Sequence, residues 1–156
     1  MKPKVYLETT IPSFLTARPS RDIVAAGQQQ ATREWWDQRR RRYGLFVSGL
    51  VLLECRRGDQ TAAKAREAAL EDIAVLEMSG AAQDLAEAIL GSGLIPRKAT
   101  PDAVHIAIAA VHGMDFLLTW NCRHIANAAI VDKVRSVCSG AGFPAPVICT
   151  PFELMS

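Results

Sequence analysis

Several features that would narrow the function at once are missing from this sequence. No stretch approaches the roughly 18 consecutive apolar residues of a membrane-spanning helix, so we expect no membrane partner. Residues 1–5 carry lysines, but no apolar run of signal-peptide length follows them. The four cysteines include no C-x-x-C pair, which favours reduced thiols over a zinc site or a disulfide framework. We therefore expect a cytoplasmic protein.

Glycine-rich phosphate loops are also absent. The chain contains neither G-x-x-x-x-G-K-[ST] nor G-x-G-x-x-G, which argues against a nucleotide-binding switch protein. The net charge is only +2, so the molecule as a whole is not an obvious nucleic-acid binder. Charge is concentrated in the four arginines of residues 39–42. Such a run either coats a solvated helix end or contacts phosphate with its planar guanidinium groups.

What the sequence does contain is enough apolar material for one folded unit. At 156 residues and 49% hydrophobic content, we expect a single domain over residues 1–156. Short apolar segments predict strands at 4–7, 45–47, 73–76, 116–119 and 147–149. Helical composition lies between them, at 11–15, 22–42, 49–57, 61–70, 81–90, 101–111 and 127–139. This alternation predicts a three-layer α/β/α fold with a mostly parallel central sheet of four to five strands.

Polar residues stand where several of these segments end. Glu8 and Asn121 each follow a predicted strand, and Ser48 ends another strand and can cap the helix that carries Glu54. Asp102 falls in the first turn of a later helix. Sites in parallel sheets form at the carboxyl ends of the strands, so these side chains should converge. Three carboxylates and an amide would then make an oxygen-rich pocket for a hard divalent cation such as Mg²⁺ or Mn²⁺.

Each of these residues also has a purely structural interpretation. Asp102 could be a helix-start acid, Glu54 a solvated edge residue and Glu8 a turn residue. Asn121 could cap the short segment at 122–125. The order of all four along one chain favours the shared cation site.

The order of these segments resembles the PIN domain, the fold of many bacterial toxin ribonucleases of the VapC type. The matching segments are Val5-Tyr6-Leu7-Glu8-Thr9-Thr10, Ser48-Gly49-Leu50-Val51-Leu52-Leu53-Glu54, Asp102-Ala103-Val104-His105-Ile106-Ala107 and Thr119-Trp120-Asn121. The resemblance spans residues 5–154. It implies a metal-dependent endoribonuclease that hydrolyses RNA, a cognate antitoxin protein as partner, and a homodimer.

The resemblance also assigns roles to individual residues. Glu8, Glu54, Asp102 and Asn121 would form the catalytic set, with Glu8 and Asp102 as the principal metal ligands and Glu54 holding a second cation or orienting water. Thr9 and Thr119 would hydrogen-bond the carboxylates or the phosphate. His105 would be packed or hydrogen-bonded near the site, and His124 could contact phosphate from the loop after the fourth strand.

Two positions depart from the family pattern. Glu8 stands where the family usually has Asp, and the extra methylene moves the carboxylate outward by roughly 1.5 Å. Asn121 stands where the family has an acid, so one negative charge is lost and a second cation should bind more weakly. These departures motivate an alternative hypothesis: a catalytically impaired PIN-like module that binds RNA or a protein without cleaving.

Residues 22–42 offer a candidate contact surface for a partner. Trp35 and Trp36 are adjacent on the predicted helix, so they should not both face the same core, and one should lie on an edge or in an interface. With the arginine run nearby, we expect this helix to contact the antitoxin or a second copy. Further along, Thr100 is expected to cap the helix that contains Asp102.

Overall fold

A computed structural model describes residues 1–155; Ser156, the last residue of the predicted domain, lies outside the described residues. The strands are β1 (Lys4–Leu7), β2 (Gly44–Ser48), β3 (Ala74–Leu76), β4 (Phe116–Leu118) and β5 (Val147–Cys149). The helices are α1 (Thr10–Thr16), α2 (Ile23–Gln38), α3 (Gly49–Cys55), α4 (Gln60–Ala69), α5 (Gly80–Gly91), α6 (Thr100–Val111) and α7 (Val131–Gly140). Two short 3-10 helices are η1 (Arg40–Arg42) and η2 (Arg97–Ala99).

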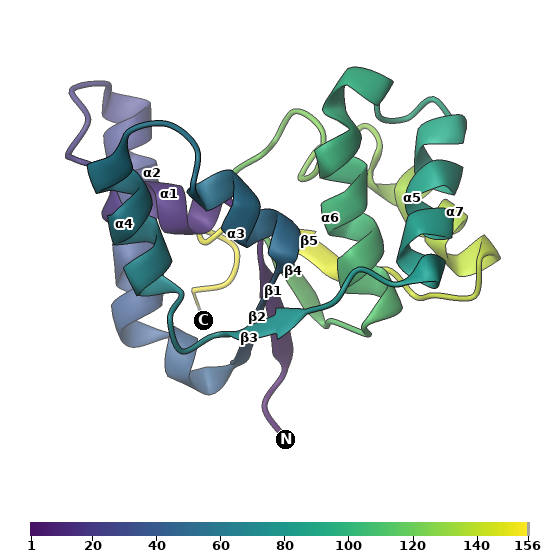
Figure 1. Ribbon diagram of the computed structural model, residues 1–156, viewed down its shortest axis with the longest axis horizontal. Helices are drawn as coiled ribbons and strands as arrows, with labels where there is room; N and C mark the ends of the chain where they lie inside the picture. The colour runs from purple at the N-terminus through teal and green to yellow at the C-terminus, as the bar shows by residue number, and fades with distance from the viewer. Residues whose placement is uncertain (156) are drawn as a thin grey trace.

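All five strands form one parallel sheet in the order β3-β2-β1-β4-β5. Figure 1 shows α1, α2 and α4 on one side of this sheet and α5, α6 and α7 on the other. The predicted three-layer α/β/α fold is therefore confirmed, with a sheet that is parallel throughout its described strands.

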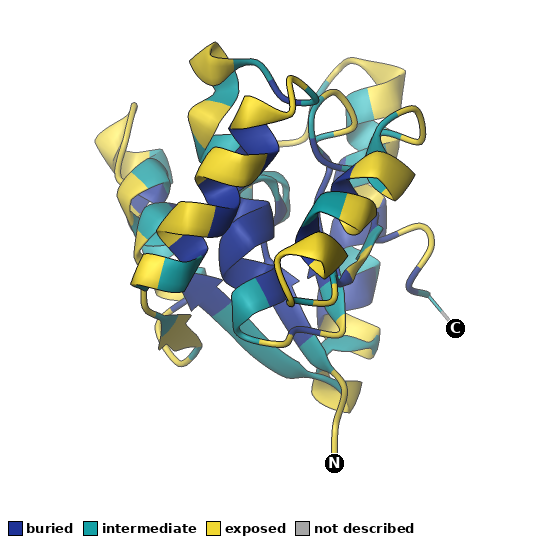
Figure 2. Cartoon of the chain, turned by 90° about the vertical axis from the view of Figure 1, so that its right-hand side faces the viewer, coloured by how far each residue is buried: buried dark blue, intermediate teal, exposed yellow. Residues whose placement is uncertain are grey.

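The central strands are apolar because helices cover both of their faces. Val5, Tyr6 and Leu7 of β1 are completely buried, as are Leu117 and Leu118 of β4. Figure 2 shows the buried residues gathered on the sheet and on the helix faces turned toward it. Because β1 has β2 on one side and β4 on the other, its carboxyl end lies between theirs.

Two predicted helices are shorter than expected. The helix at 22–42 ends at Gln38, and the arginines continue as η1. The helix expected from residue 127 begins at Val131, because the Asn127 side chain accepts a hydrogen bond from the Ala129 amide and donates one to the Arg123 carbonyl. These local bonds favour a turn over a helix.

The prediction for the adjacent tryptophans was wrong. Both Trp35 and Trp36 are buried, and both belong to the same hydrophobic core. Trp35 stacks on Tyr43 with 5.8 Å between ring centroids. The Arg40 guanidinium lies 4.6 Å from the Trp36 ring centroid in a cation–π contact.

The arginine run lies at the amino end of β2, since η1 immediately precedes that strand. Polar residues that follow the strands lie at the opposite edge of the sheet. The arginines therefore do not flank the carboxyl edge. Among the residues that the structure describes, no helix is both long enough and apolar enough to cross a membrane.

A pair of valines on two strands of this sheet tests the burial pattern. Val47 on β2 is completely buried, whereas Val147 on the edge strand β5 is 53% exposed. We expect Val47→Ala to lower the free energy of unfolding by about 2 kcal/mol, through two lost methyl contacts and a cavity. Val147→Ala should change it by less than about 0.5 kcal/mol. Urea unfolding of both variants measures the difference, and equal losses would contradict the burial described here.

Candidate functional site

Residues from three strands meet at the carboxyl edge of the sheet. Glu8 directly follows β1, Ser48 ends β2, and Asn121 lies shortly after β4. The Ser48 hydroxyl accepts a hydrogen bond from the Val51 amide at 3.4 Å and caps α3. The helix that Ser48 starts carries Glu54 back over this edge.

Glu8 is held through one of its two carboxylate oxygens. It is only 4% exposed, and its Oε1 accepts hydrogen bonds from the Thr10 amide (3.1 Å), the Thr10 hydroxyl (2.5 Å) and the Thr119 hydroxyl (2.7 Å). Within residues 1–155 the only fully buried side-chain polar atom without a partner is Trp35 Nε1. Glu8 Oε2 receives none of the three bonds and is not such an atom, so it keeps some contact with solvent and has no partner among the described side chains.

Glu54 is held in the same way from the other side. Its Oε1 accepts the Thr9 hydroxyl at 2.6 Å and lies 2.7 Å from His105 Nε2, while the side chain keeps 20% of its exposure. Burial by itself raises the pKa of Glu54, but the hydrogen bonds from His105 and Thr9, with smaller contributions from nearby positive charge, outweigh it and lower the pKa. Glu54 is therefore ionised at neutral pH with Oε2 left unengaged.

His105 is completely buried and connects the site to the centre of the sheet. Its Nδ1 lies 2.6 Å from the Tyr6 hydroxyl, and that hydroxyl lies 2.8 Å from Ser48 Oγ. Sequence reasoning placed His105 near the site but assigned no role to Tyr6. The available signal was a phenol in an otherwise apolar central strand, since a buried phenol needs a hydrogen-bond partner.

Thr10 is the second residue that sequence reasoning left without a role. Besides donating to Glu8, its hydroxyl oxygen accepts a hydrogen bond from the Trp120 amide at 2.8 Å. It therefore ties the start of α1 to the segment after β4. Its spacing two residues after an acid at a strand end was the signal.

Asn121 uses its side-chain oxygen within its own turn. Its Oδ1 accepts the His124 amide at 3.0 Å, which caps the segment at residues 122–125, and its own amide donates to Thr119 Oγ1 at 2.9 Å. The cap anticipated as an alternative is thus present. His124 is half-buried in this loop.

Asp102 lies in the first turn of α6 and is half-buried. The predicted Thr100 cap was wrong, because that hydroxyl donates backward to the Arg97 carbonyl at 2.5 Å and no side chain caps the helix. Asp102 is one turn before His105 on the same helix. The helix that orients Glu54 through His105 is therefore also the one that carries Asp102.

The donor types suit a hard divalent cation, since Glu8 and Glu54 each offer a free carboxylate oxygen and Asp102 supplies a third acid. Their spacing is wider than a closed site requires. Among residues 1–155, no three His, Cys, Asp or Glu side chains lie close enough to hold one ion.

No protein-family model matches this chain, and no curated protein matches it in sequence. Solved structures do match. VapC20 of Mycobacterium tuberculosis, described as a sarcin-ricin loop cleaving toxin, is 17% identical with a TM-score of 0.56, over 92% of this chain and 100% of that chain.

A second match comes from VapBC2 of Rickettsia felis, solved bound to a DNA fragment from its promoter. It is 13% identical with a TM-score of 0.55, over 94% of this chain and 97% of that chain. At such identities the likeness establishes the fold. This chain has the PIN-like fold of VapC toxins, as the motifs had indicated.

The lowered pKa of Glu54 predicts a pH-dependent contribution to stability. A carboxyl whose folded pKa lies below its unfolded value stabilises the fold above the unfolded pKa, about 4.3 for Glu, and loses this as pH falls through the folded pKa. We expect Glu54→Gln to cost about 1–2 kcal/mol at pH 7, the size of hydrogen bonds to a charged group, and much less near pH 3. Thermal melts across this range measure it. Glu71→Gln, at an exposed position, is the control, and a Glu54→Gln deficit that does not shrink in acid would contradict the assignment.

Proposed function

We propose that this protein is a divalent-cation-dependent endoribonuclease that hydrolyses RNA phosphodiester bonds, and that it is the toxin of a type II toxin–antitoxin pair. The observation that carries the proposal is the paired arrangement of Glu8 and Glu54, each with one oxygen held and one free at the same sheet edge. The PIN-like fold, shared with a toxin described as cleaving the sarcin-ricin loop, supports RNA as the substrate class.

In this proposal Glu8 and Asp102 are the principal ligands of a Mg²⁺ or Mn²⁺ ion, and Glu54 holds a second ion or orients the attacking water. The cation, when bound, supplies charge neutralisation at the scissile phosphate and acidifies water. Thr10 and Thr119 keep the free oxygen of Glu8 directed outward, and Thr9 does the same for Glu54. Asn121 shapes the loop from which His124 approaches the phosphate.

The alternative is a PIN-like module that binds RNA or a protein without cleavage. It is favoured by the engaged amide oxygen of Asn121 and by the open spacing of the acids in the described residues. Cleavage assays separate the two proposals, because only the enzyme turns RNA over.

The partners proposed are RNA, a cognate antitoxin and a second copy of the chain. The antitoxin is supported by the likeness to VapBC2, which was solved with promoter DNA. The two tryptophans of α2 do not contribute to the contact surface expected on that helix, because both are buried, although Ile23 and Val24 at its start are exposed. A second surface, at α3 and β3, combines exposed apolar side chains with a groove.

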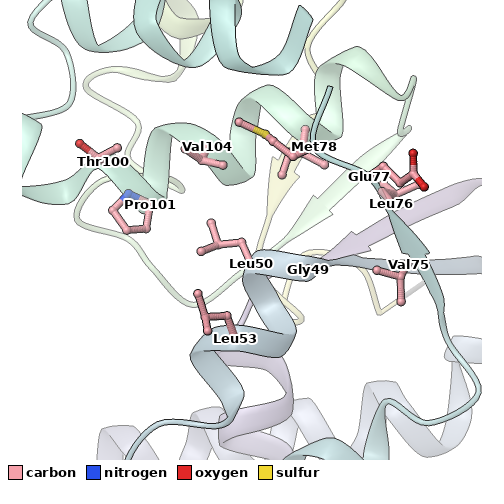
Figure 3. Close-up of a pocket in the computed structure, with 11 residues that line it drawn as sticks. Gly49, Leu50, Leu53, Val75, Leu76, Glu77, Met78, Thr100, Pro101 and Val104 are labelled. Carbon is pink, nitrogen blue, oxygen red and sulfur yellow. The ribbon is translucent and has the colours of Figure 1, made fainter. Parts of the chain in front are cut away.

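An apolar groove of about 730 Å³ runs between α3, β3 and the start of α6. Figure 3 shows Leu50 and Leu53 on α3 facing Val104 of α6, with Val75 on the edge strand and Met78 beyond it. The rest of the lining is Gly49, Leu76, Glu77, Thr100, Pro101 and Ile108. Glu77 is the only charged residue of the groove, so the groove does not suit a polyanion such as RNA.

We assign this groove to a second copy of the chain. The same surface holds a hollow and protruding apolar side chains, with Leu53 and Val75 each 50% exposed and Met78 44% exposed. A two-fold contact requires such a self-complementary patch. The edge strand β3, Ala74-Val75-Leu76, also lacks the charges that normally protect an exposed edge from pairing.

Proximity to the acids gives this contact a role in the site. Leu53 directly precedes Glu54, and Pro101 directly precedes Asp102, so the groove is walled by the two helices that carry these acids. A second copy seated there would fix α3 relative to α6. This would restrain the separation of Glu54 and Asp102, two of the proposed ligands, which the described chain does not group with a third acid around one ion.

Asp102 provides the direct test of the proposed activity. We expect Asp102→Ala to reduce Mg²⁺- or Mn²⁺-dependent cleavage of structured RNA by about 100-fold or more, the loss typical of removing one charge-stabilising group. Asp84→Ala, an exposed acid on α5, is the matched control and should cleave normally. Cleavage rates measured with purified protein test this prediction. Cleavage by Asp102→Ala at the parent rate would contradict the proposed site. No cleavage by the unaltered chain would favour the non-cleaving module.

The two edge strands supply a matched pair for the dimer. Val75→Lys places a charge in the groove, whereas Val147→Lys places one on the opposite edge strand at similar exposure. Sedimentation equilibrium should give about twice 17.0 kDa for the unaltered chain and for Val147→Lys, and 17.0 kDa for Val75→Lys. A monomeric unaltered chain, or a Val75→Lys variant that still pairs, would refute this interface.

A further inference from the structure

A continuous chain of hydrogen bonds runs from the end of β2 to the candidate site. It passes from Ser48 Oγ to the Tyr6 hydroxyl (2.8 Å), from there to His105 Nδ1 (2.6 Å), and from His105 Nε2 to Glu54 Oε1 (2.7 Å). Ser48, Tyr6 and His105 are completely buried. Because these side chains do not contact water, each of their hydrogens needs an acceptor within the chain itself.

The two ends of the chain fix the direction of its protons. An ionised Glu54 can only accept, so His105 Nε2 must carry a hydrogen and donate it. At the other end, the Tyr6 phenol is completely buried and lies within hydrogen-bond distance of both Ser48 Oγ and His105 Nδ1. A phenol carries its proton at neutral pH, so Tyr6 has one hydrogen to donate.

Two arrangements remain for the middle of the chain. If His105 carried hydrogens on both nitrogens, Nδ1 would donate to Tyr6 and Tyr6 would donate to Ser48. The Ser48 hydroxyl hydrogen would then have no acceptor among the described contacts, because its remaining partner, the Val51 amide, is itself a donor. If His105 is neutral with its hydrogen on Nε2, Ser48 donates to Tyr6 and Tyr6 donates to Nδ1, and every hydrogen has an acceptor.

We propose that Tyr6 is a positioning residue: through the Ser48–Tyr6–His105 chain it sets the Nε2–H tautomer of His105, which holds Glu54 Oε1 and leaves Glu54 Oε2 directed to the open side of the site. The functional part of this inference rests on the proposed nuclease activity. The tautomer itself does not, and it can be measured whether or not the protein cleaves RNA. The arrangement resembles the way outer hydrogen bonds orient histidine and carboxylate ligands at metal centres.

The tautomer can be observed directly by NMR. Long-range ¹H–¹⁵N correlation spectra of ¹⁵N-labelled protein at neutral pH distinguish the Nε2–H, Nδ1–H and doubly protonated rings. His105 is one of three histidines, and a His105→Gln spectrum identifies its signals. We expect the neutral Nε2–H pattern in the unaltered chain and its loss, through mixing with the Nδ1–H form, in Tyr6→Phe.

The kinetic consequence has a matched control, because the chain contains two tyrosines. Tyr6→Phe removes the donor to Nδ1 but keeps the ring in the core. We expect kcat for RNA cleavage to fall about 10- to 100-fold, as for other outer hydrogen bonds to ligands, with KM little changed. Tyr43→Phe, which removes a hydroxyl outside this chain from a ring stacked on Trp35, should keep the parent kcat.

Each outcome bears on the proposal. A doubly protonated or Nδ1–H ring in the unaltered chain would overturn the proton assignment. A Tyr6→Phe variant with the altered tautomer and parent kcat would overturn the positioning role. If the unaltered chain cleaves no RNA but shows the Nε2–H ring that Tyr6→Phe loses, the nuclease proposal fails while the tautomer assignment stands.

Discussion

The structure depends on hydrogen bonds that hold two acids at an edge where carboxylates are costly to bury. Glu8 is almost completely enclosed, and an ionised carboxylate there requires partners to replace water. Thr10 and Thr119 supply them, and they come from α1 and from the end of β4. The hydrogen bonds that offset the cost of burying the Glu8 carboxylate also fix the positions of α1 and the end of β4 relative to each other. The stability of the fold and the geometry of the site are therefore linked.

Glu54 extends this link to the helices on the other face of the sheet. Its partners, Thr9 and His105, come from the segment after β1 and from α6, on opposite sides of the sheet. Because His105 also contacts Tyr6, α6 is tied to the central strand by a buried polar chain as well as by apolar packing. A buried hydrogen-bond chain of this kind is favourable when every donor in it has an acceptor. The neutral Nε2–H form of His105 is the arrangement that meets this condition.

The apolar groove lies beside this part of the structure, because Leu53 and Pro101 in its lining directly precede Glu54 and Asp102. Its walls are α3 and the start of α6, the helices that position Glu54 and Asp102. The described chain by itself does not bring three acids within reach of one ion. The proposed partner contact and the spacing of the proposed metal ligands therefore depend on the same pair of helices, and a contact at the groove would act directly on the site.

Much of this was readable from the sequence because it follows from local signals. Apolar runs located all five strands, and Ser48 marked the start of α3. The resemblance in fold rested on acids at strand ends, which parallel topology places together. Long-range partners gave no such signal: Tyr6 and His105 are 99 residues apart, and only the packing of α6 on β1 brings them together. The tryptophan pair was misjudged because helical periodicity did not foresee that Arg40 would cover Trp36.

The most direct test of the account is whether the free oxygen of Glu8 helps to bind a divalent cation. Thermal melts of the unaltered chain and of Glu8→Gln, each with EDTA and then with millimolar Mn²⁺, measure this without requiring an RNA target. The account predicts that Mn²⁺ raises the melting temperature of the unaltered chain, because a ligand bound by the folded state stabilises it, and that Glu8→Gln loses this rise. An unaltered chain whose melting temperature does not respond to Mn²⁺, or a Glu8→Gln variant that responds equally, would contradict it.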